Sequence, residues 1–143
     1  MRMRAYKVIG ISDINSAYNT ILLDQQFSQH LKILWKGPQG ICPENVDKPW
    51  KTYIPTAMLF GVRSAQCIFG LGRILSCQEF IQPQCPKVAY QIAYESYTDN
   101  IMVGSHVGVE DVNRMIEIAE KGLNKGNMYL KEWAVTGVNG HEI

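Results

Sequence analysis

With 143 residues, the chain has the length of one domain, and we expect it to fold as one. Apolar residues make up 46% and charged residues 19%, a globular balance that excludes a disordered chain. No apolar run reaches the roughly 20 residues that a membrane-spanning helix needs, and the apolar stretch near the N-terminus is too short for the core of a signal peptide. We therefore expect an intracellular protein, with cytoplasm and nucleus both open.

The charged, cysteine and histidine residues set further limits on what the chain can bind. The net charge is +1, from 14 basic and 13 acidic side chains, so any attraction to nucleic-acid phosphates must be local. The cysteines form no Cys-x-x-Cys pair and the histidines are scattered, so the spacing of a zinc site is absent from the sequence. We expect reduced thiols that are buried or inert.

The first half of the chain predicts three strands. Residues 6–12 contain a short apolar run that is typical of a buried strand, and this strand places Asp13 at its carboxyl end. Residues 31–35 and 50–54 predict two further strands. The glycines and prolines between them favour a wide antiparallel hairpin.

Helices dominate the next part of the chain. Residues 64–80 carry Ile68, Leu71 and Leu75 at helical spacing, with Phe69 alongside. The prolines at 83 and 86 end this helix. A short second helix is expected after them, with apolar positions at Val88, Ala89 and Ile92.

The last part of the chain predicts a helix and a strand. The helix is the clearest amphipathic element in the sequence and ends at Gly126, with apolar positions at Val109, Val112, Ile116, Ala119 and Leu123. A closing strand is expected over 128–133, and a frayed tail over about 136–143. The order of elements predicts an α+β fold, with an antiparallel sheet backed by helices on one face.

The segment Tyr97-Thr98-Asp99-Asn100 predicts a tight hairpin turn before the apolar residues 101–103. An Asp-Asn pair also suits a type I′ turn, in which both residues have positive φ. An antiparallel sheet can bring Asp99 next to Asp13, and carboxylates on neighbouring strands are the ligands that magnesium prefers. Nucleotidyl transfer uses two such ions about 3.5–4 Å apart. Asp13 and Asp99 are therefore candidate ligands of two Mg²⁺ ions, or of Mn²⁺ in their place.

Several segments, in this order, resemble the reverse transcriptase palm of BEL/Pao-type LTR retrotransposons. The likeness runs from about Tyr6 to Ala134 and rests on Asp13–Tyr18, Phe60–Gln66, Tyr97–Gly104 and Lys131. The resemblance implies a ferredoxin-like polymerase palm, here a single fragment over 1–143 with at most part of the fingers. The thumb, RNase H and integrase of such polyproteins are not among these residues.

The resemblance also implies a function, RNA-directed synthesis of DNA on a primer. Its partners would be an RNA or DNA template with primer, deoxynucleoside triphosphates and the remaining polyprotein domains, with no membrane. The implied catalytic residues are Asp13, Asp99 and Asn100, the first two as metal ligands. Tyr18 would exclude a ribose 2′-hydroxyl, and Lys131 is the nearest match to a lysine that donates a proton to pyrophosphate. The implied nucleotide-binding residues are Ile14, Tyr18, Phe60 and Gly61.

Asn100 leaves an alternative open. Three carboxylates would give the metal pair a ligand charge of −3, whereas Asp13, Asp99 and Asn100 give −2, so we expect weaker metal binding. Polymerases of some negative-strand RNA viruses resemble this chain in having Asp-Asn at the matching hairpin. The alternative is a catalytically inactive retroelement-derived domain that acts at most as a nucleic-acid or protein binding module.

Simpler interpretations of single residues also stay open. Tyr18 could be a half-buried aromatic residue of the sheet, and Phe60 could be a core residue. Gly61 could relieve crowding in a tight turn, and Lys131 could lie at an exposed strand end. A ferredoxin-like RNA-binding domain of another lineage is a third hypothesis. Such a domain should carry a basic-glycine-aromatic signature, which the sequence lacks.

Overall fold

The computed structural model describes residues 5–137 of the chain. Its strands are β1 (Val8–Asp13), β2 (Ile33–Trp35), β3 (Lys51–Tyr53), β4 (Asn100–Ser105) and β5 (Ala134–Thr136). Its α-helices are α1 (Gln25–Ser28), α2 (Ala65–Ser76), α3 (Pro86–Tyr90) and α4 (Val109–Lys125). A 3-10 turn, η2 (Ala17–Thr20), follows β1, and two π-helical turns, η3 (Cys77–Ile81) and η4 (Gln91–Glu95), extend α2 and α3.

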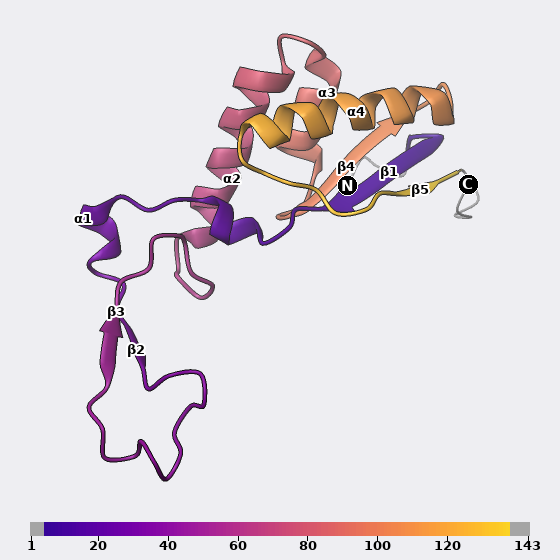
Figure 1. Cartoon of the computed structure of the whole chain (residues 1–143). Coiled ribbons are helices and arrows are strands. Elements are labelled where there is room, and N and C mark those ends of the chain that lie inside the picture. The colour runs from indigo at the N-terminus through magenta and orange to yellow at the C-terminus, as the bar shows by residue number, and fades with distance from the viewer. Residues whose placement is uncertain (1–4, 138–143) are drawn as a thin grey trace.

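The fold is α+β, as predicted, with a three-stranded antiparallel sheet packed against helices. The strand order is β4-β1-β5, and Figure 1 shows α4 lying across β1 and β4. Burial alternates along β1, so that Val8 and Ser12 face the helices while Ile11 and Asp13 lie on the more open face. The end of β1 therefore presents an acidic side chain away from the helical layer.

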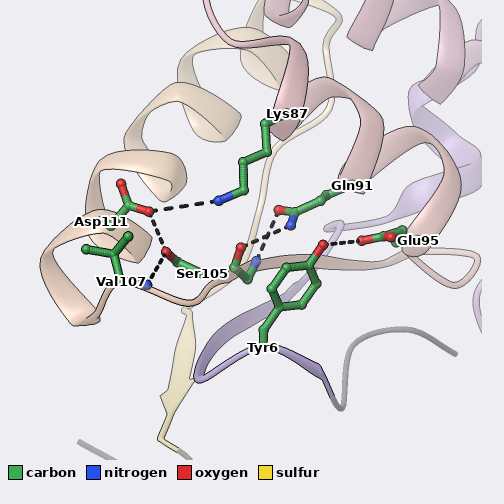
Figure 2. A network of polar contacts seen from close by, with 8 residues as sticks. Tyr6, Lys87, Gln91, Glu95, Ser105, Val107 and Asp111 are labelled. Atoms are coloured by element: carbon green, nitrogen blue, oxygen red, sulfur yellow. Dashed lines mark hydrogen bonds and ion pairs between the residues drawn. The ribbon is translucent and has the colours of Figure 1, made fainter.

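The outer edge of β4 is held by a side chain rather than by another strand. The Gln91 amide is buried, donates to the Gly104 carbonyl at 3.0 Å and accepts from the Gly104 N–H at 3.1 Å (Figure 2). The Ser96 hydroxyl accepts from the Met102 N–H at 2.9 Å. Because these bonds satisfy backbone groups that a strand edge leaves free, they fix β4 against η4.

The predicted hairpin in the first half is confirmed, although both strands are shorter than expected. β2 and β3 pair antiparallel, with Trp35 opposite Lys51, and the hairpin extends away from the sheet (Figure 1). All the residues of both strands are exposed, and the rings of Trp35 and Tyr53 meet edge to face at 5.6 Å. The hairpin contributes little to the core that supports β1.

Helix α2 confirms the predicted helix, but its buried face differs from the predicted one. Leu71 and Leu75 are 57% and 52% exposed, whereas Phe69 and Arg73 are buried. The buried face includes an arginine, a serine and the predicted Phe69, and it is turned around the helix away from Leu71 and Leu75.

The predicted closing strand over 128–133 is wrong in position. Leu130 forms only an isolated bridge with Ile14, and the ladder resumes as β5, which includes Thr136 from the predicted tail. Trp133 turns toward α4, where its indole N–H donates to Glu120 at 3.0 Å, so the chain leaves the sheet before β5. The remainder of the predicted tail, from 138 onward, lies outside the described residues.

The cysteines differ in exposure. Cys77 is buried, and burial raises the pKa of its thiol to about 12, whereas Cys67 is exposed. The expectation of a buried thiol is confirmed for Cys77, whereas the inertness expected of the exposed Cys67 stays a prediction.

Over residues 5–137, none of the helices combines the length and the apolar character needed to cross a bilayer.

Candidate functional site

Asp13 lies at the end of β1 between two chain segments. On one side it is directly opposite Asn100 in the β1–β4 register, and the next N–H, that of Ile14, donates to the Asp99 carbonyl at 2.9 Å. On the other side, the Lys131 N–H donates to the Asp13 carbonyl at 2.8 Å. Asp13 therefore lies beside the 97–100 turn, as predicted, and Lys131 lies on its other side.

The acidic turn is tight, but it differs from the predicted hairpin. Tyr97 and Asn100 exchange both backbone hydrogen bonds, at 3.1 and 2.8 Å, while the chain up to Glu95 is helical rather than a strand. The Tyr97–Asn100 bonds place Thr98 and Asp99, not Asp99 and Asn100, at the centre of the turn. A type I′ turn requires positive φ at both central residues, whereas among residues 97–100 only Thr98 has it, at 50°. A β-branched residue in this conformation is strained, so other contacts must hold the turn in place.

Arg73 supplies one of these contacts, and the sequence analysis missed it. Its guanidinium, on the buried face of α2, donates to the carbonyls of Thr98 and, at 3.4 Å, Ala93, while its Nε has no hydrogen-bond partner within residues 5–137. Burial lowers the pKa of Arg73. Its position four residues after Phe69, beside Gly72, was the available signal for a buried arginine.

Replacing Arg73 by methionine is expected to loosen the turn without emptying the space beside it. Charge-assisted hydrogen bonds contribute about 1.5–3 kcal/mol each, so the amides of Ile14 and Asn100 should exchange with solvent about tenfold faster. Hydrogen exchange followed by NMR measures this rate. Arg114→Met, on an exposed position of α4, is the matched control, and equal protection in both variants would contradict the bracing role.

Lys131 forms an ion pair with Asp13. Its Nζ lies 2.5 Å from Asp13 Oδ2, and the two side chains are 55% and 33% exposed. This hydrogen bond and the charge of Asp13 raise the pKa of the Lys131 ammonium, and the charge of Asp99 acts in the same direction. A proton donor works best with a pKa near the ambient pH, so the pairing with Asp13 weakens Lys131 as an acid in this state. The proton-donor role stays a prediction.

Two of the residues implied to bind a nucleotide lie together. The rings of Tyr18 and Phe60 meet edge to face at 4.8 Å, and Phe69 supports Tyr18 from the core at 5.7 Å. Phe60 is 73% exposed and so is not a core residue. The pair forms an aromatic surface that a flat or apolar group can contact.

The other two implied nucleotide-binding residues have different surroundings. Gly61 has φ of 84°, and a side chain added there would meet no atom within 4 Å, so the glycine serves the backbone conformation rather than a crowded turn. The Ile14 side chain is only 1% exposed, so any contact of Ile14 with a nucleotide would come from its backbone.

The donor set at the end of β1 consists of hard oxygen atoms. Within residues 5–137, no three His, Cys, Asp or Glu side chains gather as a metal cluster. Asp13 and Asp99 supply two carboxylates, and Asn100 adds an amide oxygen opposite Asp13. Such a set fits Mg²⁺ or Mn²⁺, which prefer oxygen ligands and retain much of their water. It does not suit zinc, which prefers nitrogen and sulfur.

A scan of the sequence against protein-family models finds no match, and a search of curated proteins finds no relative. The function proposed below therefore rests on the residues and their arrangement.

Proposed function

We propose that this chain is the palm of an RNA-directed DNA polymerase of the BEL/Pao retrotransposon type. The observation that carries the proposal is the position of Asp13 at the end of a central strand, opposite Asn100 and one register step from Asp99. The three-stranded sheet with helices on one face is compatible with the ferredoxin-like palm that the sequence resembles.

Further support comes from the backbone. Ser16 and Thr98 both have φ of 50°, and each lies within three residues of Asp13 or Asp99. Non-glycine residues in this region are costly and cluster at functional sites, although Asn127, after α4, also has positive φ. Two of the strained positions within residues 5–137 therefore lie beside the candidate carboxylates.

Each residue has a proposed role. Asp13 and Asp99 would hold two Mg²⁺ or Mn²⁺ ions, which when bound activate a primer 3′-hydroxyl and stabilise the leaving pyrophosphate. Tyr18, supported by Phe60, would contact the sugar of a deoxynucleoside triphosphate and exclude a 2′-hydroxyl. Asn100 would offer a neutral oxygen to the same site. Template, primer and the other polyprotein domains belong to this proposal.

The test is isothermal titration of the chain with magnesium and dTTP. Asp13→Ala and Asp99→Ala should each weaken binding by about tenfold or more, since each removes one of two ligand charges. Asp47→Ala, in the exposed loop between β2 and β3, is the control and should bind as the wild type does. Primer extension by a longer parent protein should also be lost in Asp13→Ala.

The inactive binding module is the second candidate function, favoured by the ion pair of Lys131 with Asp13 and by the neutral Asn100. In that case the magnesium and nucleotide titration would show no dependence on Asp99. This result would overturn the polymerase proposal.

A further inference from the structure

The side chain of Lys131 is held beside Asp13 by its own backbone. The Lys131 N–H donates to the Asp13 carbonyl at 2.8 Å, and its carbonyl accepts from the buried Ser12 hydroxyl at 2.9 Å. The ammonium then reaches Asp13 Oδ2 at 2.5 Å. Because both backbone groups are fixed against the end of β1, the ion pair needs no further ordering of the backbone and restricts only the rotamers of the side chain.

This ammonium changes the charge that a metal ion would meet. Asp13 and Asp99 together carry −2 and Lys131 carries +1, so the three side chains sum to −1, while Asn100 adds no charge. A divalent cation that approaches Asp13 finds Oδ2 already bound to a cation. It must displace the ammonium or bind through the other oxygen under repulsion from it.

We propose that Lys131 is a resident counter-cation that sets the divalent-cation affinity of the Asp13 and Asp99 site. It occupies Oδ2 of Asp13 until a metal ion displaces it. The inference rests on the proposed function, which places the metal ion at these carboxylates. It gives Lys131 a role in the metal-free protein that proton donation to pyrophosphate does not include.

The test is a titration of the full 143-residue chain with Mn²⁺ in the absence of nucleotide, with free Mn²⁺ measured by electron paramagnetic resonance. Lys131→Met should bind Mn²⁺ about three- to tenfold more tightly, because it removes a like charge from the site. Lys131→Arg keeps the charge and should bind with the wild-type affinity.

Lys121→Met is the matched control. It removes the same charge from a lysine that is 72% exposed and pairs with Glu117 instead, at 3.9 Å. Its Mn²⁺ affinity should equal that of the wild type. Circular dichroism reports whether each variant folds, and Lys131→Gln replaces Lys131→Met in the titration if the latter does not.

The outcomes separate the two proposals. If the wild type binds Mn²⁺ in a manner that depends on Asp99, but neutral variants at 131 bind no more tightly, the role of Lys131 is overturned and the metal site remains. If neither the wild type nor the variants show binding that depends on Asp99, both proposals fail.

Discussion

Replacing Asn100 by aspartate is expected to raise the Mn²⁺ affinity of the chain by about tenfold or more. Asn100 lies directly opposite Asp13 in the β1–β4 register and is exposed, so the new carboxylate would face the same site without disturbing the core. A unit charge about 4 Å from another gains about 1 kcal/mol even in bulk water, and about twice that from a dication. Since about 1.4 kcal/mol corresponds to a tenfold change in affinity, the effect should be readily measured.

The same substitution should act on stability in the opposite sense when no metal is present. The two facing carboxylates of Asn100→Asp repel each other, so the melting temperature should fall without Mn²⁺ and rise more steeply than in the wild type as Mn²⁺ is added. Thermal unfolding over a series of Mn²⁺ concentrations measures both effects. Asn113→Asp adds the same charge at an exposed position of α4. An equal response of the two variants would show that position 100 is not part of a metal site.

The parts of the site that the sequence could predict are those that follow from strand periodicity and from the resemblance. The buried apolar run before Asp13 predicts a strand, and an antiparallel sheet then allows the 97–100 turn to lie beside it. Local pattern and the order of segments sufficed for these features. The resemblance assigned Tyr18 and Phe60 to the same function, but the contact between their rings comes from the structure alone.

The parts that the sequence could not predict depend on side chains that meet across the fold. The ion pair of Lys131 with Asp13 joins residues 118 positions apart, and no local pattern encodes it. Arg73 suggests an exposed charge by its residue type, because arginine is rarely buried. It is buried here, where it donates to the carbonyls of Thr98 in the strained turn and of Ala93 in η4. The buried face of α2 includes this arginine, whereas the hydrophobic spacing of Leu71 and Leu75 favours a face that is exposed.

Replacing Gly122 by alanine is expected to destabilise the fold by up to about 2 kcal/mol, because α4 packs against η3 at this glycine. A Cβ at position 122 of α4 would lie 2.2 Å from Ile81 Cγ1 in η3, a distance that requires the Ile81 side chain or the helices to shift. Overpacking of a core costs about 1–3 kcal/mol or more, while the better helix propensity of alanine returns about 1 kcal/mol. The clash should outweigh the propensity, and urea unfolding followed by circular dichroism measures the difference.

Two further variants decide whether the clash with Ile81 causes the destabilisation expected of Gly122→Ala. Gly70→Ala lies in α2, where an added Cβ meets no atom within 4 Å, so it should leave stability unchanged or raise it by up to about 1 kcal/mol. Ile81→Ala removes the clashing atom and opens a cavity that the methyl group introduced by Gly122→Ala would partly fill. The double variant should therefore cost less than the sum of the single variants. Additive costs would mean that the packing of α4 against η3 does not depend on this contact. Because η3 continues the helix that carries Arg73, a loosened α4–η3 contact should also weaken the support of the Asp99 turn.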